Sequence, residues 1–402
     1  MTRVDVLVVG AGPAGASAAL TARARGLDVL LVDKAAFPRD KTCGDGLTAS
    51  ALRLLEGLGV DAPALPGYER VQETVLVSPS GRQVDLPLPG VGDHSAVVPR
   101  AELDAALVRH VRASGIEFRE ATPITRLNEN GDMMRAELGD DTSVAADFVV
   151  AADGHWSAVR RLREASDGPD LGTWHAVRQY FRGVTDRRQW VLFERDLLPG
   201  YAWVFPLAGG RANVGFGILR ADHSGAGRSG KDLATLWRDV VERPSVRAVL
   251  GPAAEPEGPH RAWPIPASYD ESRLTDGRVL YTGDAAAVVD PMTGEGIAQA
   301  LETGALAIEA VVHGREPAAV AARYRRAVHR SVGRDLRFAS ALQRVLRSSL
   351  GARAAIRAAG LTPWTRKNFA RWMFEDYPRA VVLTPDRWHA GMFTGPGAYR
   401  AA

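Results

Sequence analysis

Three glycines near the N-terminus have the spacing of a phosphate-binding turn. Gly10, Gly12 and Gly15 form a G-x-G-x-x-G pattern. The first glycine of this pattern permits a tight turn, the second lets the backbone approach a diphosphate, and the third lets a helix pack on a strand. The free N–H groups at that helix N-terminus favour an anion. The spacing therefore predicts binding of a dinucleotide.

The residues around these glycines have the pattern of a strand–helix–strand unit. Residues 4–9 are largely apolar and β-branched, residues 16–25 are strong helix formers, and residues 27–32 form a second apolar run. Asp33 ends the second run, where an acid can bond the hydroxyls of a ribose. An acid at this position favours FAD or NAD over NADP.

Two later segments point to a flavin. Asp153-Gly154 follows an apolar run at 147–152, and Gly283-Asp284 follows another at 279–282. They resemble the D-G and G-D motifs of the p-hydroxybenzoate hydroxylase-like superfamily. In that superfamily the second aspartate bonds the ribityl chain, and the glycines after it bring a helix N-terminus to the flavin. Arg100 matches an arginine that these proteins place near the flavin and its phosphates.

The resemblance implies that the cofactor is FAD. The residues expected to bind it are Gly10, Gly12, Pro13, Ala14, Gly15, Asp33, Lys34, Lys41, Cys43, Gly44, Arg100, Asp153, Gly154, Gly283, Asp284, Pro291, Gly294, Gly296 and Ile297.

Two further segments narrow the family. Residues 37–48 contain Cys-Gly-Asp-Gly and look like the signature of the geranylgeranyl reductase family, which includes actinobacterial menaquinone side-chain reductases. Residues 199–206 resemble that family's PxxYxWxFP pattern, with one residue instead of two between proline and tyrosine, and residues 213–217 are also family-like. The resemblance runs from residue 4 to about residue 310.

The family implies that Tyr201, Trp203 and Phe205 line a substrate pocket beside the flavin. Their spacing of two places all three on one face of a strand, and aromatic rings suit an apolar ligand. An ordinary sheet core is the alternative. Cys43, Tyr201 and Trp203 are the catalytic candidates. Cys43 is a proton donor, a flavin contact or a small packing residue, and the nearby Lys41 would favour its thiolate.

The expected fold is α/β, with a Rossmann-like FAD-binding domain, an inserted antiparallel β-sheet substrate domain and a helical C-terminal region. We expect the discontinuous FAD-binding domain at 1–72, 98–170 and 275–318. The β-rich substrate domain is expected at 73–97 and 171–274, and a helical region with an aromatic tail at 319–402. Helix and strand patterns underlie these ranges, among them a hairpin at 73–86 and a helix at 101–113.

Composition bounds the compartment and the partners. The chain of 402 residues has one cysteine and no apolar run long enough to span a bilayer, which predicts a cytoplasmic protein. Between residues 320 and 372, 13 Arg or Lys residues face one acid, Asp335. This segment is either a solvated helical face or a contact for an acidic partner or the inner membrane surface. No nucleic-acid motif accompanies it, and the histidines lack metal-ligand spacing. Oligomeric state is left open.

The expected reaction is reduction of a C=C bond in an isoprenoid or other lipid-like substrate, by hydride transfer from reduced flavin. NAD(P)H or a ferredoxin-like carrier would donate electrons transiently. The main alternative is a monooxygenase acting on an aromatic or polyketide-type metabolite. A halogenase is disfavoured because no lysine lies between Lys41 and Lys231. Structural use of FAD in a cyclase stays open.

Overall fold

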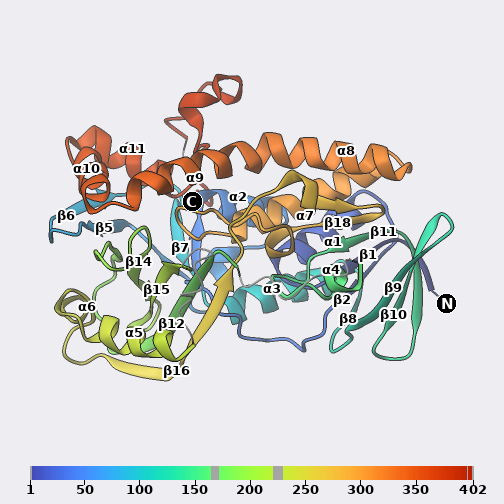
Figure 1. Ribbon diagram of the computed structural model, residues 1–402, viewed down its shortest axis with the longest axis horizontal. Helices are drawn as coiled ribbons and strands as arrows, with labels where there is room; N and C mark the ends of the chain where they lie inside the picture. The colour runs from blue at the N-terminus through green and yellow to red at the C-terminus, as the bar shows by residue number, and fades with distance from the viewer. Residues whose placement is uncertain (1, 164–171, 221–229, 396, 401–402) are drawn as a thin grey trace.

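The computed structural model describes residues 2–163, 172–220, 230–395 and 397–400. The domain boundary expected between residues 170 and 171 lies outside these ranges. Two large sheets and a set of C-terminal helices build the molecule (Figure 1). This architecture confirms the predicted fold class. The residue bounds that we assigned to the domains remain a prediction.

The first large sheet has eight strands and carries the N-terminal glycine turn. Its main path runs β17-β18-β11-β1-β2-β8, and β9 and β10 extend it beside β11. Neighbouring strands from β18 to β8 are parallel. Their apolar runs are buried because helices cover them. The strands are β1 (Thr2–Val9), β2 (Val29–Val32), β8 (Glu117–Arg119), β9 (Ile124–Asn130), β10 (Met133–Leu138), β11 (Ser143–Ala151), β17 (Thr275–Asp276) and β18 (Val279–Tyr281).

Helices α1 (Pro13–Ala24), α3 (Arg100–Ala113), α7 (Ile297–Val312) and α8 (Pro317–Val328) pack in the same core. The alanines of α1 allow α7 to approach closely. At Gly304 of α7 the helices nearly touch, because a Cβ built there would lie 2.2 Å from the Ala14 carbonyl oxygen. The shorter helices α2 (Ala49–Gly57) and α4 (Ala158–Arg163) complete this part.

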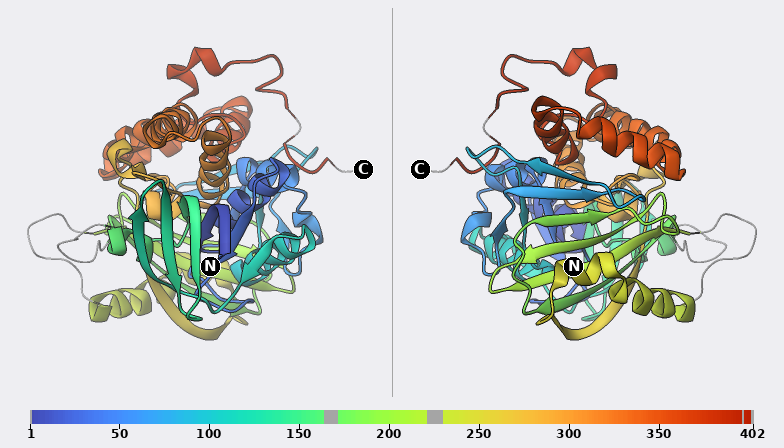
Figure 2. Two further views of the ribbon diagram at one scale, coloured as in Figure 1. Left: turned by 90° about the vertical axis from the view of Figure 1, so that its right-hand side faces the viewer. Right: turned by 90° about the vertical axis from the view of Figure 1, so that its left-hand side faces the viewer.

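The second large sheet has seven strands in the order β16-β12-β15-β14-β13-β5-β6. The predicted hairpin joins it through a parallel pairing of β5 with β13, whereas the other pairs are antiparallel. Helices α5 (Gly230–Glu242) and α6 (Pro244–Leu250) pack against one face (Figure 2). The strands are β5 (Glu73–Val77), β6 (Gln83–Pro87), β12 (Trp174–Arg182), β13 (Gln189–Leu192), β14 (Tyr201–Leu207), β15 (Arg211–Leu219) and β16 (Glu255–Ile265).

A small third sheet was not expected. It has the order β3-β7-β4, formed by β3 (Gly46–Thr48), β4 (Glu69–Arg70) and β7 (Ser95–Val97). Because β3 follows the Cys-Gly-Asp-Gly segment directly, its pairing with β7 anchors that segment between the two large sheets.

The region after Pro317 is mainly helical, as predicted. Helices α9 (Arg334–Leu346), α10 (Ser349–Ala359) and α11 (Pro363–Met373) follow α8, and α10 and α11 pack near β6. Figure 2 shows these helices on the side of the molecule opposite α5 and α6. The chain then returns toward the first sheet, where Arg379 contacts Asp290 at 3.2 Å.

Candidate active site

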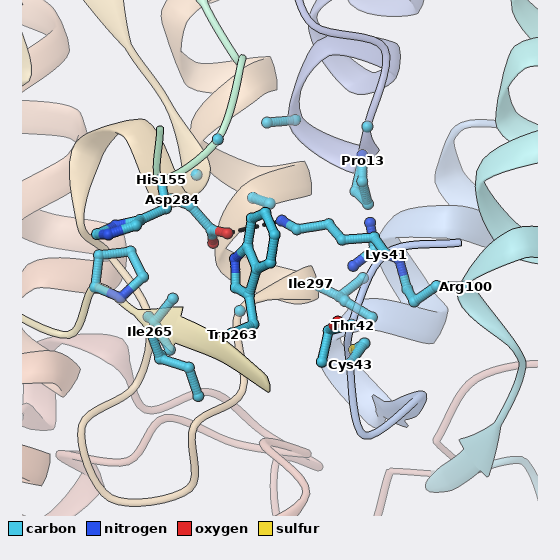
Figure 3. A pocket seen from close by; sticks show the side chains of 18 of the residues that line it. Pro13, Lys41, Thr42, Cys43, Arg100, His155, Trp263, Ile265, Asp284 and Ile297 are labelled. Carbon is cyan, nitrogen blue, oxygen red and sulfur yellow. Dashed lines mark hydrogen bonds and ion pairs between the residues drawn. The ribbon is translucent and has the colours of Figure 1, made fainter. Parts of the chain in front are cut away.

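A cavity of about 410 Å³ lies where the two large sheets meet. All but one of the residues predicted for cofactor or substrate line it, although they come from segments far apart in the chain (Figure 3). The exception is Gly15, which lies beneath the turn. The volume of the cavity falls in the usual range for a ligand site.

The glycine turn has the shape that its spacing predicts. Gly10 has φ +102°, and a Cβ there would lie 2.4 Å from the Ala152 carbonyl oxygen. A Cβ at Gly15 would lie 1.7 Å from the Gly10 carbonyl oxygen. Gly12 differs, because its Cβ would meet the Arg39 guanidinium alone, at 3.5 Å. The turn therefore needs glycine at positions 10 and 15 because of these close contacts. At Gly12 the missing side chain instead leaves space in the cavity.

Two helices direct uncapped N-termini at this cavity. Helix α1 begins after Gly12 and α7 begins after Gly296, and neither has a side-chain cap or an acid in its first turn. Both caps line the cavity. Free backbone N–H groups attract an anion or an electron-rich ring edge. Together with the space left at Gly12, these backbone N–H groups fit the diphosphate and the polar flavin edge of FAD.

The predicted ribose-binding acid is buried at the end of β2. Asp33 accepts hydrogen bonds from the backbone N–H groups of Ala11, at 2.6 Å, and Ala35, at 2.8 Å. These bonds fix the carboxylate beside the glycine turn. Asp153 is held at the end of β11, where it accepts from the Val159 N–H at 3.0 Å, and burial raises its pKa.

Three ion pairs lie beside the cavity. Lys41 Nζ lies 2.7 Å from Asp284 Oδ2 (Figure 3). Burial opposes the charge of Asp284, but the lysine holds the pKa of that carboxyl below its usual value. Arg100 makes two bonds of 3.0 Å to Asp104, which Arg39 also contacts at 3.2 Å. These ion pairs hold positively charged side chains in fixed positions beside the cavity.

Cys43 lines the cavity, but its surroundings differ from the expectation. Burial raises the pKa of its thiol, and the cation that opposes this effect is Arg100. The expectation that Lys41 favours the thiolate is wrong, because Lys41 is engaged by Asp284. At neutral pH Cys43 is a thiol.

A buried network ties the Cys-Gly-Asp-Gly segment to the second sheet. Asp45, with φ +63°, accepts from Tyr180 Oη at 2.7 Å, Asn213 Nδ2 at 2.8 Å and the Arg100 N–H at 3.1 Å. Burial raises the pKa of Asp45 to about 6 against these donors. Asn213 also donates to the Cys43 carbonyl oxygen at 2.8 Å and accepts from Trp203 Nε1 at 3.0 Å. Asp45 and Asn213 stood in family-like segments, but nothing in the sequence paired them.

An aromatic wall lines the same cavity as the glycine turn. Tyr201, Trp203 and Phe205 lie on one face of β14, with successive ring centroids 6.1 and 6.0 Å apart. Tyr201 Oη donates to the Thr293 carbonyl oxygen. The rings pack in a core and also line the cavity. Their role in binding substrate stays a prediction.

Sequence reasoning missed several other cavity residues. Trp174 comes from β12, and Trp263 and Ile265 come from β16. Positions 261 and 263–266 line the cavity, but the prolines of that segment concealed a strand. Glu295, between Gly294 and Gly296, was missed as well. Its signal was a lone acid within a flavin-binding glycine segment.

The part of the chain that the structure describes contains no helix long and apolar enough to cross a membrane. Across the described ranges, no group of three or more His, Cys, Asp or Glu side chains is arranged to hold a metal ion.

A dinucleotide cradle that opens onto an aromatic cavity defines the class of a flavoprotein oxidoreductase. The chain belongs to the FAD binding domain family, whose model matches residues 3–334. It is an FAD-dependent oxidoreductase.

Its relatives confirm the predicted likeness to geranylgeranyl reductases. The chain is 35% identical to a menaquinone reductase of Mycolicibacterium smegmatis, over 78% of this chain and 77% of the relative. It is 32% identical to a digeranylgeranylglycerophospholipid reductase of Methanosarcina mazei, over 77% and 75%. The fold matches a crystal structure of a geranylgeranyl bacteriochlorophyll reductase-like protein from Thermoplasma acidophilum, with a TM-score of 0.80, 22% identity, and 96% and 100% of the two chains covered.

Proposed function

We propose that this enzyme reduces a C=C bond of an isoprenoid or other apolar, lipid-like substrate by hydride transfer from reduced FAD. The observation that carries the proposal is the cavity itself, which is lined both by the dinucleotide cradle and by the aromatic wall. The names of the relatives, menaquinone reductase and digeranylgeranylglycerophospholipid reductase, support the same class of substrate.

FAD would be held by the residues predicted for it. The turn from Gly10 to Gly15 and the N-terminus of α1 would bind the diphosphate, Asp33 the ribose, and Asp284 the ribityl chain. The N-terminus of α7 would lie at the flavin's pyrimidine edge. When bound and reduced, FAD supplies the hydride.

The aromatic wall would bind and orient the substrate. Trp203 and Phe205 present large apolar surfaces that exclude water, which suits a polyprenyl chain. Trp203 is held through Asn213, and Asn213 is held through Asp45, so the wall and the Cys43 loop keep one relative position. A fixed wall places the double bond at a constant distance from the cofactor.

The test is anaerobic turnover of the FAD-loaded enzyme, reduced with dithionite, with a polyprenyl quinone, a polyprenyl diphosphate and a geranylgeranyl ether lipid. Mass spectrometry should show a gain of two hydrogens for at least one substrate, with reoxidation of one flavin per product. A gain of one oxygen that requires O₂ would instead assign a monooxygenase. Product formed with oxidised FAD and no reductant would assign a non-redox role.

We infer that the electron donor binds only transiently. FAD would fill the glycine turn that follows β1, so a nicotinamide could not occupy that turn at the same time. The donors to compare are NADH, NADPH and reduced ferredoxin, by stopped-flow measurement of flavin bleaching. A donor dissociation constant below about 1 μM would contradict transient binding.

We further infer that the enzyme works in the cytoplasm at the inner face of the membrane, through helices α9 to α11. Leu350, Leu361 and Trp364 are 65–72% exposed there. Several exposed cations of these helices have no ion-pair partner in the described ranges: Arg344, Arg347, Arg353, Arg357 and Lys367. Exposed apolar side chains among unpaired cations match an anionic lipid surface.

Vesicle sedimentation tests this contact. Binding to phosphatidylglycerol vesicles should exceed binding to phosphatidylcholine vesicles, fall with salt, and weaken several-fold in Trp364→Ser. Val91→Ser is the matched control, because Val91 is an apolar side chain that is 64% exposed and lies outside α9 to α11. Equal binding to both lipids, or equal loss in both variants, would rule the contact out.

A further inference from the structure

Glu295 has no role in binding FAD as described above, although it lies inside the cavity. It belongs to the loop that brings Gly294 and Gly296 to the start of α7. Its Oε1 lies 3.2 Å from the Cβ position of Gly46, and the same position is 3.7 Å from the Phe205 ring. The carboxyl therefore lies where the flavin-binding loop, the Cys43 segment and the aromatic wall meet.

No described residue donates a hydrogen bond to the Glu295 carboxyl, whereas the other cavity acids are bonded. Asp33 accepts two backbone N–H groups, Asp45 accepts three donors and Asp284 is paired with Lys41. Glu295 keeps a partly exposed side chain. A carboxylate largely withdrawn from bulk water and without a donor is still costly, so such a group holds its proton.

The charges around Glu295 act in the same direction. Its pKa is raised to about 8, first by burial and then by the charges of Glu375 and Asp290, while Arg379 acts in the opposite direction. Arg379 is itself occupied by Asp290, at 3.2 Å, and by Glu375, at 3.6 Å. Cys43 and Tyr201 also lie within electrostatic range of Glu295. The C-terminal segment that carries Glu375 and Arg379 thus contributes, after burial, to the pKa of a cavity acid.

The other groups with a transferable proton are less suited. Tyr201 Oη directs its hydrogen to the Thr293 carbonyl, and burial raises the pKa of that phenol. Cys43 lies beside the Arg100 guanidinium, so a proton lost from it would leave a thiolate in a charge pair. Of the three, Glu295 alone combines a proton held at neutral pH with an oxygen free of a committed partner.

We propose that Glu295 is the general acid that delivers the proton when the double bond is reduced. This inference rests on the proposed function. The double bond takes a hydride, with its electron pair, at one carbon, and the proton of Glu295 at the other. Two C–H bonds form, and three bonds break: the C=C π bond, the Glu295 O–H bond and the bond that held the hydride on the reduced flavin. The carboxylate then regains a proton from water. A hydride from a nicotinamide, or two electrons from a ferredoxin-type donor with one proton from water, would restore reduced FAD.

The test compares Glu295→Gln with the wild type in single turnover. With FAD reduced by dithionite, reoxidation by substrate should be about 10²- to 10⁴-fold slower in the variant, which is the range for loss of a general acid. The wild-type rate should fall tenfold per pH unit above about pH 8, and Glu295→Gln should lack this dependence. Glu295→Asp should recover part of the rate and the pH dependence. Glu242→Gln, an exposed change on α5, is the matched control.

A second measurement does not depend on activity. Infrared difference titration of the FAD-free protein should show a protonated carboxyl at pH 7 that titrates near pH 8 and is missing in Glu295→Gln. FAD affinity should be equal in the two proteins.

The outcomes separate the two proposals. A wild type that reduces no double bond overturns the proposed function, while the infrared titration still tests the state of Glu295. A wild type that turns over, with Glu295→Gln equally fast, overturns the role of Glu295. Loss of the pH dependence in Cys43→Ser, with its retention in Glu295→Gln, would transfer the role to Cys43.

Discussion

Replacing Gly12 by alanine is expected to weaken FAD binding without destabilising the apoprotein. Gly12 has φ −74° and ψ −173°, which alanine adopts freely. The added Cβ would meet the Arg39 guanidinium alone, at 3.5 Å, an ordinary contact. Gly12 is the N-cap of α1 and has no side chain to lose, so the free energy of unfolding should change by less than about 1 kcal/mol.

The cost appears when the diphosphate is bound. The added methyl group would occupy the space beside residue 12 through which phosphate oxygens approach the first N–H groups of α1. Losing one charge-assisted hydrogen bond of about 1.5–3 kcal/mol raises the dissociation constant of FAD roughly 10- to 150-fold.

Gly15→Ala provides the contrast within the same turn. Its Cβ would lie 1.7 Å from the Gly10 carbonyl oxygen, which belongs to the backbone and cannot rotate away. Relief requires the helix or the turn to move by more than an ångström. We expect a loss of about 3 kcal/mol or more in the free energy of unfolding, at the upper end of overpacking costs.

The assay pairs denaturant unfolding of each apoprotein with titration of FAD by flavin fluorescence. Gly12→Ala should unfold with the wild type and bind FAD weakly, and Gly15→Ala should unfold early even without FAD. The reasoning is refuted if Gly12→Ala binds FAD as the wild type does, or if Gly15→Ala is as stable as the wild type.

Three further changes have defined outcomes. Gly304→Ala should destabilise the protein by about 2–3 kcal/mol in denaturant unfolding, because its Cβ would lie 2.2 Å from the Ala14 carbonyl oxygen. Arg379→Ala should cost about 3–5 kcal/mol by the same measurement, since it leaves Asp290 buried without its cation. Burial opposes the charge of Asp376, but His94, Arg53 and Arg371 hold its pKa at about 2. The pKa of Asp376 in the folded protein lies below the ordinary 3.8. Asp376 therefore contributes about 2 kcal/mol to the free energy of unfolding above pH 4, and this contribution is lost as pH falls toward 2.

Each of these has a control. Gly57→Ala, in α2, meets nothing within 4 Å and should not destabilise. Arg334→Ala removes an exposed ion pair with Asp386 and should cost at most about 1 kcal/mol. Asp376→Asn should flatten the acid dependence of stability between pH 4 and pH 2. The steric and electrostatic arguments would be contradicted if Gly57→Ala or Arg334→Ala destabilised the protein as much as Gly304→Ala or Arg379→Ala. They would also be contradicted if Asp376→Asn kept the wild-type dependence of stability on pH between 4 and 2.

Local spacing was enough to predict the nucleotide-binding part. The turn at Gly10, Gly12 and Gly15 constrains only its own strand and helix, and its chemistry is carried by backbone N–H groups that need no distant partner. The hairpin at β5 and β6 and the helical C-terminal region were predicted for the same reason, because their periodicity is local.

Contacts between distant segments were beyond the sequence. The parallel pairing of β5 with β13 joins residues more than a hundred positions apart, and no local pattern specifies it. The strand β16 was missed because its prolines argue against a strand, and they are tolerated there because it lies at the edge of the sheet.

By itself the sequence determined the cofactor, the reductase-like family and the aromatic face of β14, because each depends on the spacing of residues that are close together in the chain. Tertiary structure decided which acid keeps a proton and which cation faces Cys43. Both depend on burial and on charges from segments that meet only in the folded chain. Glu295 acquires its raised pKa from its own burial and from Glu375, a residue 80 positions away in the C-terminal segment.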